Sequence, residues 1–414
     1  MNRHSRRVFG ALFVCSWAGN QFSPMLLLYK EVDHYSAATV TLFLGIYVAG
    51  LAPALVIAGA ISDHIGRRTP MLWAVAFGLV GSTFLALDGF GQVPILIGRL
   101  LAGMSVGTAM AVGTTWLKEL SMPPHDPRAD AGAGARRTSL AFTLGSALGA
   151  LVAGCIAQWG PWPHVLPFAI HLTVTVGFLW LIRTVPETVP ARGTGDLRSG
   201  LRVRSARHRR FVRVVAVCGP WLFIACGLSY GYQPVLLADA AGSLGLAYAT
   251  LLSVIALGSG ALIQPVAKRI DSVSSARGLI VALLTLLVGL GVMIAATSSD
   301  SLILGVCASV VLGAGFGIGL VSGLLEVQRI APADELAKLT GVFYAVAYIG
   351  FAAHRARRAD TAVHHRRAAP GARRPADRLA ARRRAWFPTT PTRARWRGID
   401  PIGRAARTVG GTLT

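Results

Sequence analysis

Long apolar stretches alternate with short polar connections from residue 8 to residue 353. A helix of roughly 17–25 apolar residues crosses the hydrocarbon core of a bilayer and satisfies its own backbone hydrogen bonds there. The pattern therefore predicts an all-α polytopic membrane protein. Its helices are expected at about 8–28, 37–61, 70–88, 93–117, 139–158, 165–182, 212–237, 245–267, 278–297, 301–325 and 338–353.

The basic residues repeat with the same alternation. Of the 25 Lys and Arg before residue 354, 23 lie in every second connection, whereas Arg99 lies inside an apolar stretch and Lys30 in an opposite loop. Connections rich in Lys and Arg stay on the cytoplasmic side of a membrane. We therefore expect a multi-pass protein of the cytoplasmic (inner) membrane with a cytoplasmic N-terminus. The low charged content (14%) and high hydrophobic content (53%) agree with this class.

An internal repeat divides the chain. Residues 59–68 align without gaps on residues 260–269, and Leu100–Gly107 aligns on Val310–Gly317 with glycines at the same offsets. Two parallel repeats place a solute site at their interface near the bilayer midplane. We expect a first half at 1–185, a cytoplasmic basic linker at 186–211 and a second half at 212–353.

Three motifs resemble those of the major facilitator superfamily. They are Gly59-Ala-Ile-Ser-Asp63-His-Ile-Gly66-Arg67-Arg68 between the second and third helices, Arg99-Leu-Leu-Ala-Gly103-Met-Ser-Val-Gly107 in the fourth, and Pro186-Glu187-Thr188 after the sixth. The resemblance covers residues 8–353. It implies a two-half helical bundle that moves a small organic solute across the membrane by alternating access, with proton-linked export as the preferred mode.

The first motif predicts a conformational latch formed by Gly59, Asp63, Gly66, Arg67, Arg68 and Glu119. Glycines permit close helix approach and a tight turn, and the paired cations hold the loop on the cytoplasmic side. Glu119 is an expected partner of Arg67. By resemblance, Asp63 would bind the start of the eleventh helix and stabilise the outward-open state. The alternative is a solvated loop whose charges only set topology.

Arg99, with Gly103 and Gly107, is a candidate for proton coupling or helix pairing. An arginine within a membrane helix is costly, by about 2.5–3.5 kcal/mol on insertion scales, so it should face a partner or a wet cavity. The alternative is that its side chain extends to the outer interface. The resemblance links this arginine to proton coupling, although no deep carboxylate offers itself as a proton carrier.

Polar and aromatic side chains in the first and seventh helices are candidates for the substrate cavity. They are Trp17, Asn20, Gln21, Tyr230, Tyr232 and Gln233. Amides inside lipid need partners, and both halves of such a bundle line its cavity. The same side chains could instead hold helices together or form an interfacial aromatic belt.

Other features restrict the function. Nucleotide-binding loops, paired carboxylates and nucleophile arrangements are missing from the sequence, so we expect a protein that is not an enzyme and needs no cofactor or metal. Its expected partners are a small-molecule solute, protons and the lipid bilayer, and we expect it to act as a monomer. The fifth helix lacks the glycine-proline pair usual in antiporters of the resembling superfamily, which weakens a drug/proton antiport assignment.

Residues 354–414 have a different composition, with 16 Arg, no Lys and three acidic residues. No apolar stretch there could supply a twelfth helix. We expect a disordered tail, for which a frameshifted reading frame, a basic arm for polyanions and a divergent natural C-terminus stay open. Two further alternatives follow for the whole chain, namely a non-transporting remnant and a membrane protein that binds polyanions through its tail. Nucleic acid is not an expected partner.

Overall fold

A computed structural model describes residues 1–129, 133–189, 203–272, 275–332, 335–336 and 338–348. The described residues belong to one compact unit, and its regular elements are all helices. The tail predicted at 354–414 and the central part of the predicted linker, residues 190–202, lie outside the described residues.

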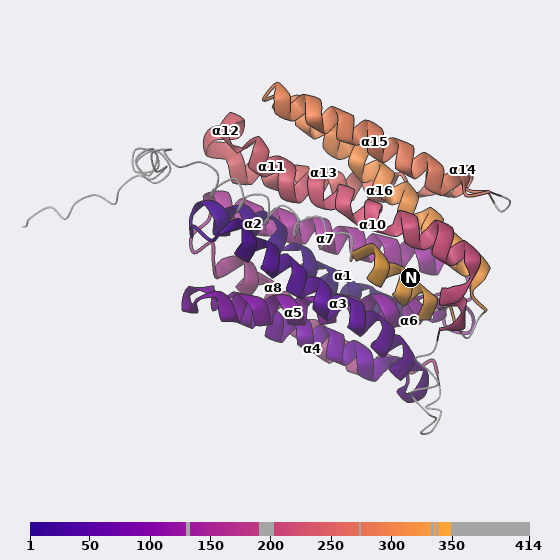
Figure 1. Cartoon of the computed structure of the whole chain (residues 1–414). Coiled ribbons are helices and arrows are strands. Elements are labelled where there is room, and N and C mark those ends of the chain that lie inside the picture. The colour runs from indigo at the N-terminus through magenta and orange to yellow at the C-terminus, as the bar shows by residue number, and fades with distance from the viewer. Residues whose placement is uncertain (130–132, 190–202, 273–274, 333–334, 337, 349–414) are drawn as a thin grey trace, which may run out of the picture. The chain divides into compact units, whose positions relative to one another are not determined.

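The first half packs as a bundle in which α3 runs along α5, α1 along α7, and α4 between α5 and α8 (Figure 1). A short 3-10 turn η1 (Asp88–Phe90) precedes α5, and a π-helical segment η2 (Ala109–Gly113) joins α5 to α6. The helices are α1 (Arg3–Asn20), α2 (Phe22–Glu31), α3 (Ala37–Ile65), α4 (Arg68–Leu85), α5 (Gln92–Thr108), α6 (Thr114–Glu119), α7 (Ala133–Trp159) and α8 (Leu166–Arg183).

The second half repeats this arrangement, with α16 packed against α15 and α13 as α5 packs against α4 and α3. It is followed by a helical stretch at residues 338–348, within the predicted eleventh helix. The elements are η3 (Arg204–Arg207), η4 (Phe211–Val215), α10 (Ala216–Gly227), η5 (Leu228–Tyr232), α11 (Gln233–Leu236), α12 (Ala238–Ala241), η6 (Gly242–Leu244), α13 (Gly245–Leu262), α14 (Gln264–Ile270), α15 (Arg277–Ser298) and α16 (Leu302–Ile330).

Eight helical segments in the described part of the chain are long and apolar enough to cross a membrane. The prediction of an all-α polytopic membrane protein is confirmed. The first predicted helix is divided at Gln21 into α1 and α2. Pro24 has no backbone N–H, so the carbonyl of Asn20 loses its helical donor at this point.

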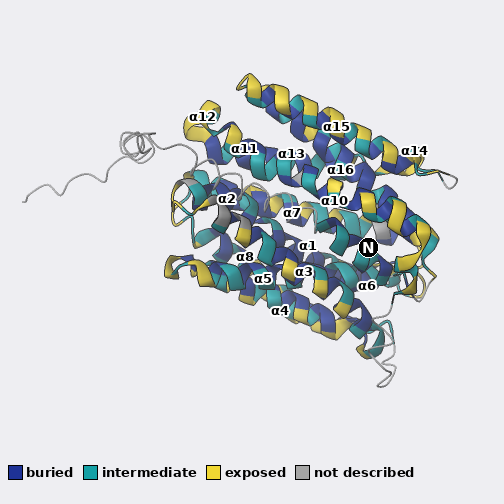
Figure 2. Ribbon diagram, in the orientation of Figure 1, coloured by how far each residue is buried: buried dark blue, intermediate teal, exposed yellow. Residues whose placement is uncertain are grey.

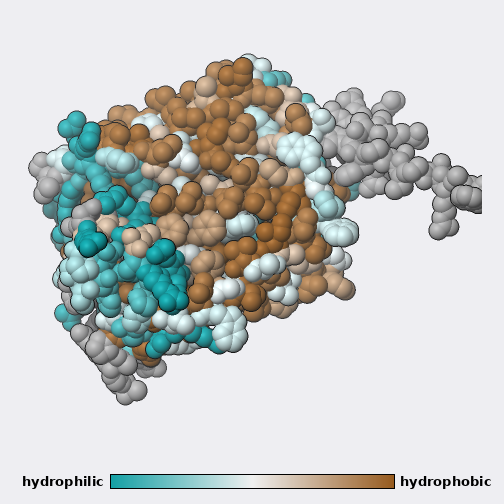
Figure 3. Space-filling model, turned by 180° about the vertical axis from the view of Figure 1, so that it is seen from behind, coloured by the Kyte–Doolittle hydropathy of each residue, from teal (hydrophilic) through white to brown (hydrophobic). Residues whose placement is uncertain are grey.

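Polar and apolar surfaces are separated along the helix axes. Hydrophobic residues cover the middle of the bundle and hydrophilic residues gather at one end (Figure 3), and the burial colours show exposed positions along the outer helix α15 (Figure 2). We call the end that carries Arg67, Lys118, Arg183, Lys268 and Arg329 the basic end. The other end, which carries Asp33, Asp88, His164, Ser243 and Asp300, is the opposite end.

The repeated glycines lie where helices approach most closely. A Cβ atom at Gly103 would lie 2.0 Å from the carbonyl oxygen of Tyr47, and one at Gly313 would lie 2.2 Å from that of Ala256. Gly107 faces the backbone of α3 in the same way, at 2.4 Å from the carbonyl oxygen of Leu51. The aligned glycines therefore pack α5 on α3 and α16 on α13 without intervening side chains.

The two halves meet along α7 and α13, and α2 also packs on α13. Near the opposite end, Gln158 Nε2 donates a hydrogen bond to the carbonyl oxygen of Ser243 (2.8 Å). The backbone N–H of Ala247 donates to Gln158 Oε1 (2.9 Å). One amide of α7 thus bridges to the segment that begins α13, and it ties the halves together at that end.

Candidate functional site

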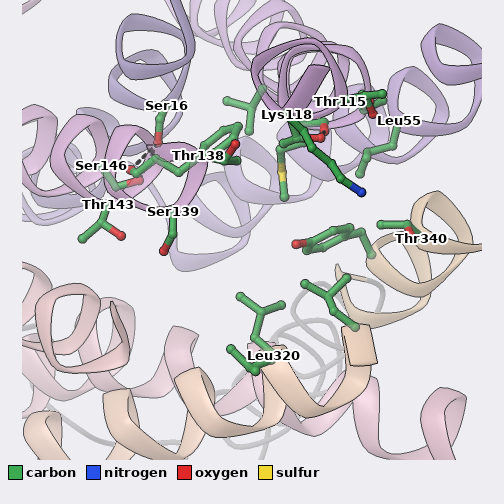
Figure 4. Close-up of a pocket in the computed structure, with 18 of the residues that line it drawn as sticks. Ser16, Leu55, Thr115, Lys118, Thr138, Ser139, Thr143, Ser146, Leu320 and Thr340 are labelled. Carbon is green, nitrogen blue, oxygen red and sulfur yellow. Dashed lines mark hydrogen bonds between the residues drawn. The ribbon is translucent and has the colours of Figure 1, made fainter. Parts of the chain in front are cut away.

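A cavity of about 1230 Å³ lies between the two halves (Figure 4). Its wall in the first half comes from α1, α3, η2, α6 and α7, and its wall in the second half from α10, η5, α13, α14, α16 and residues 336–348. The lining reaches the basic end at Asp63, Lys118 and Lys338. Gln158 and the other contacts between halves at the opposite end are not part of it. The cavity therefore reaches only the basic end in the described part of the structure.

The inner part of the cavity is aromatic. The rings of Phe223 and Tyr348 lie with centroids 4.1 Å apart, and Tyr47 of the other half stands 6.4 Å from Tyr348. These three residues were absent from the sequence-based candidates. They lie in predicted helices without a polar motif around them, so the sequence offered no signal that separates them from core aromatics.

One wall carries hydroxyl groups along α7. Thr138, Ser139, Thr143 and Ser146 all line the cavity (Figure 4). Their spacing keeps them on one face of a helix, since residues three, four and seven apart lie on the same side. The sequence carries this signal as hydroxyl residues at helical spacing, although the sequence-based cavity candidates included only residues of the first and seventh predicted helices.

Asn20 and Tyr230 are the two sequence-based cavity candidates that line the cavity. Asn20 Nδ2 donates to Ser146 Oγ (2.9 Å), and Ser16 Oγ lies 2.7 Å from the same hydroxyl. This network holds α1 against α7 and places an amide and hydroxyl groups on the wall of the cavity.

Trp17 and Gln21 do not line this cavity, so their role in solute binding stays a prediction. Gln21 is fully buried and donates through Nε2 to Ser82 Oγ (3.0 Å). Trp17 is buried with its ring centroid 6.0 Å from that of His171. Successive helical residues point about 100° apart, so the neighbour of a cavity residue faces another helix.

For the same reason, Tyr232 and Gln233 of the predicted seventh helix do not line this cavity. Gln233 is fully buried and donates through Nε2 to the carbonyl oxygen of Gly305 on α16 (2.6 Å). Tyr232 packs against the main apolar cluster and does not line the cavity. Both residues connect helices, which was the alternative interpretation of these polar groups.

Two π-helical segments place backbone and side chains at the cavity. Met110 lies in η2 and Tyr230 in η5, on opposite walls. In η2 the hydroxyl of Thr114 donates to the carbonyl oxygen of Met110 (2.6 Å). In η5 Pro234 has no backbone N–H, so it cannot donate the usual helical hydrogen bond to the carbonyl oxygen of Tyr230. Such local changes of helical pitch are frequent at functional sites.

The predicted latch lies at the basic end and contains the expected pair. Arg67 bonds Asp63 (2.8 Å), Ser62 Oγ (2.6 Å) and Glu119 (3.3 Å). Asp63 is 47% exposed and lines the cavity wall. Its ion pair in the described structure is with Arg67 of its own half, so its proposed contact with the start of the eleventh helix stays a prediction.

Glu187 completes this cluster from the Pro-Glu-Thr segment. Its carboxylate accepts hydrogen bonds from the backbone N–H groups of Arg67 (2.7 Å) and Arg68 (3.0 Å). Gly66 has φ +90°, and a Cβ atom there would lie 2.5 Å from Glu187 Oε2. The turn therefore requires glycine at this position. Gly59 has no such role, because an added Cβ atom would meet nothing closer than Ala111 at 3.9 Å.

Arg99 is buried between helices rather than extended toward the interface. Its Nε donates to the carbonyl oxygen of Phe43 (3.2 Å) and its Nη1 to that of Gly19 (3.3 Å). The guanidinium lies over the rings of Phe22 (4.4 Å) and Tyr47 (4.2 Å). Arg99 thus joins α1, α2 and α3 to α5, directly behind the cavity residue Tyr47.

The second half has its own charge cluster, which the sequence-based candidates did not include. Glu326, 1% exposed, bonds Arg210 Nε (2.6 Å) and Arg329 Nη1 (2.9 Å), and Arg329 also pairs with Asp271. These residues come from the start of η4, the C-terminal part of α16 and the end of α14, and they are not aligned with the first motif. Glu335 binds the backbone N–H of Ser205 (2.8 Å), much as Glu187 binds that of Arg67.

A titratable cluster lies at the opposite end. His164 Nδ1 lies 2.8 Å from Asp88 Oδ2, which also accepts a bond from the Tyr29 hydroxyl (2.7 Å). His164 Nε2 lies 3.7 Å from Asp33. The hydrogen bond with Asp88 and the two carboxylates raise the pKa of His164, whereas burial opposes this shift. The described residues include no group of three His, Cys, Asp or Glu arranged to hold a metal ion.

We predict that this cluster makes stability depend on pH. Because the folded protein raises the pKa of His164, its stabilising contribution is complete below the unfolded value of about 6.5 and is lost as pH rises through the folded value. Replacing His164 with glutamine should lower the free energy of unfolding by about 1 kcal/mol at pH 6, the scale of one charge-assisted hydrogen bond. Unfolding measured from pH 6 to pH 9 tests this.

In this series, the free energy of unfolding of His164→Gln should approach that of the wild type at pH 9. His125→Gln, at the basic end, is the control and should keep the wild-type pH profile. An unchanged pH profile in His164→Gln would show that the cluster is not protonated as we describe.

We also predict that Arg99→Met separates folding from transport. An apolar side chain of similar length should leave the free energy of unfolding within about 1 kcal/mol, as when buried charges are replaced by packed apolar groups. Solute flux in proteoliposomes should fall at least about tenfold, because the guanidinium and its ring contacts connect the cavity wall to α1 and α5. Arg183→Met, which removes an exposed arginine from Trp180, should leave flux unchanged. Normal flux in Arg99→Met would assign Arg99 to packing alone.

Residues 8–353 match the family model of the Major Facilitator Superfamily. Among curated proteins, the chain is 34% identical over 97 residues to an uncharacterized MFS-type transporter, YceJ, of Bacillus subtilis (strain 168), covering 23% of this chain and 25% of that protein. It is 27% identical over 175 residues to the multidrug transporter QDR2 of Candida glabrata, covering 41% of this chain and 28% of that protein. The matches thus span about a quarter of the length of either relative.

Solved structures with a similar fold cover far more of the chain. A D-xylose-proton symporter superposes with a TM-score of 0.63 at 18% identity, covering 85% of this chain and 88% of that one. The nucleoside transporter NupG superposes with a TM-score of 0.66 at 12% identity, covering 84% and 88%. An inward-facing bacterial homolog of the lysosomal transporter Spinster gives 0.63 at 14% identity, covering 86% and 81%.

Proposed function

The chain belongs to the Major Facilitator Superfamily, and we propose that it moves a small organic solute across the cytoplasmic membrane by alternating access. The observation that supports this most directly is the cavity of about 1230 Å³ between the halves. It reaches the basic end, while Gln158 connects the halves at the opposite end. A solute site shared by two repeats is the arrangement that rocking of one half against the other requires.

We assign the basic end to the cytoplasm, with the N-terminus on that side, because Lys and Arg concentrate there. The structure is then an inward-facing state. Outward opening requires the bridge from Gln158 to Ser243 and Ala247 to break and the basic end to close. The latch around Arg67 lies on the cavity wall and would bind the other half in that closed arrangement.

We further propose proton-linked export as the mode of transport. The cavity receives solute from the cytoplasmic side in this state, and the Candida glabrata relative is named a multidrug transporter. Among the described residues that line the cavity, the carboxylate is Asp63, which lies at the basic end beside Arg67. Proton release to the cytoplasm would therefore pass this pair.

Cysteine labelling tests the proposal without a known solute. In a chain whose five native cysteines are replaced, Thr143→Cys should react with a membrane-impermeant thiol reagent from the basic side in inside-out vesicles. It should react more slowly from the other side in intact cells. Cross-linking Gln158→Cys to Ser243→Cys with a short bifunctional reagent should abolish labelling from outside only.

Two outcomes would contradict this cycle. Labelling from the basic side alone, with or without the cross-link, would exclude alternating access. If the ratio of outside to inside labelling rates does not change when a pH gradient is imposed across the membrane, proton linkage would be excluded. A control variant, Ser299→Cys without cross-linking, should react from the outside throughout.

A further inference from the structure

Building on the proposed transport cycle, on which it rests, we infer that the cavity binds organic anions with an aromatic or apolar body and rejects organic cations. The inference comes from the charges that face the cavity. The described lining contains four cationic side chains, and its one carboxylate belongs to Asp63. Asp63 is already paired with Arg67 at 2.8 Å.

The other three cations are the lysines Lys118, Lys268 and Lys338. None of them forms an ion pair with a carboxylate in the described part of the chain. Glu335, three residues before Lys338, directs its oxygens to the backbone N–H groups of Arg204 (3.2 Å) and Ser205 (2.8 Å). Glu335 still interacts electrostatically with Lys338 without forming an ion pair, whereas the positive charges of Lys118 and Lys268 are available to a solute in the described structure.

The lysines approach the cavity from both halves. Lys118 lies in the last turn of α6 in the first half and points into the space between the halves (Figure 4), whereas Lys268 and Lys338 belong to the second half. An anionic group between them would interact with both halves at once. A cation there would meet like charges on both sides, because low-dielectric walls focus their fields.

A further positive charge lies behind the inner wall. Arg99 stacks on Tyr47, whose ring lines the cavity, and its hydrogen bonds go to backbone carbonyls rather than to a carboxylate. Buried charge is weakly screened, so this guanidinium contributes a positive field at depth. The cavity is positive at both its inner and its basic parts.

The residues of the inner lining indicate what kind of uncharged body the solute carries. Phe223 contacts Tyr348 and Phe316, with ring centroids 4.1 Å and 5.1 Å apart, and Tyr47 adds a ring from the other half. Such surfaces bury apolar or aromatic groups, while Asn20 and the hydroxyls of α7 offer hydrogen bonds. The arrangement fits a carboxylate or sulfonate attached to an aromatic body.

Topology alone would place lysines at the basic end without regard to the cavity. The experiment therefore compares lysines that line the cavity with basic residues that do not. Thr143→Cys in the cysteine-replaced chain, purified in an uncharged detergent, is treated with sulfonatoethyl, trimethylammonioethyl and methyl methanethiosulfonates. These reagents are anionic, cationic and neutral. Ser299→Cys, exposed at the opposite end, supplies the reference rates.

We expect the ratio of anionic to cationic reaction rates at Thr143→Cys to exceed that at Ser299→Cys by about tenfold. Adding Lys118→Gln, Lys268→Gln or Lys338→Gln should lower this ratio by about twofold to threefold each. Arg6→Gln and Arg213→Gln, which remove exposed basic residues outside the cavity, should leave it unchanged.

A ratio equal to or below the reference, or one that the Arg6 and Arg213 variants lower as much as the lysine variants do, would overturn the inference. Failure of the transport proposal looks different, because a closed cavity would leave Thr143→Cys unreactive toward the neutral reagent as well. Thr340→Cys, on the facing wall, repeats the measurement if the Thr143 variant does not fold.

Discussion

Replacing Gly103 with alanine should lower the free energy of unfolding by about 2–3 kcal/mol, the range found for overpacked cores. The added Cβ atom would lie 2.0 Å from the carbonyl oxygen of Tyr47 and 2.9 Å from the backbone nitrogen of Leu51. Both atoms belong to the backbone, so no side-chain rotation relieves the clash and α3 must move away from α5. Reversible unfolding of the purified protein in detergent measures the effect.

Gly45→Ala is the matched control, because this glycine of α3 has no atom within 4 Å of an added Cβ. Its free energy of unfolding should stay within about 0.5 kcal/mol of the wild type. The movement in Gly103→Ala should also separate Arg99 from Tyr47, since Arg99 lies one turn before Gly103 on the same helix. Equal stabilities of the two variants would show that α3 and α5 do not approach as closely as described.

Features that depend only on a short stretch of sequence could be predicted. Hydrophobic length and the alternation of Lys and Arg depend on the solvent around each segment, so they identify spans and the basic end without knowledge of packing. The aligned glycines Gly103 and Gly313 are equally local signals, because close backbone contact excludes side chains. The expected partner of Arg67 was found for the same reason, since Glu119 ends a helix at the same membrane face.

The division of polar residues between cavity and core was not predictable in this way. Asn20 lines the cavity and its neighbour Gln21 is buried against Ser82. Hydropathy treats the two amides alike, and only the rotation of the helix in the folded bundle separates them. Tyr230 and Gln233 differ for the same reason, and the break at Gln21 and the π-helical turn η5 make the rotation harder to extrapolate.

Contacts between residues far apart in the chain could not be predicted from the sequence either. Glu187 binds the backbone of Arg67 and Arg68 from 120 and 119 residues away, respectively. Its motif was recognised, but its structural role depends on how α8 returns to the end of α3. The cluster around Glu326 arises in the same way, from the start of η4, the C-terminal part of α16 and the end of α14. Both clusters gather at the basic end, where the proposed cycle requires the halves to change their contacts.

Removing the charge of Glu326 should have the largest effect on the second half. In Glu326→Gln, the 1% exposed side chain no longer offers a carboxylate to Arg210 and Arg329, which remain beside a buried site. Breaking a buried ion pair from one side costs about 3–5 kcal/mol, and we expect about 3 kcal/mol because both arginines are partly exposed. Unfolding in detergent measures this, with Asp63→Asn as the control. The Asp63 side chain is 47% exposed, and Arg67 keeps its bonds to Ser62 and Glu119 in this variant, so the loss should not exceed about 0.5 kcal/mol.

A double-mutant cycle then separates pairing from packing. If the ion pair carries the stability, adding Arg210→Gln to Glu326→Gln should cost little more than Glu326→Gln alone, with a coupling energy of about 1–3 kcal/mol. Arg210 begins the seventh span and Glu326 ends α16, so the pair fixes two helices of the second half at the end where the cavity opens. Additive losses in the cycle would mean that the two residues stabilise the protein independently.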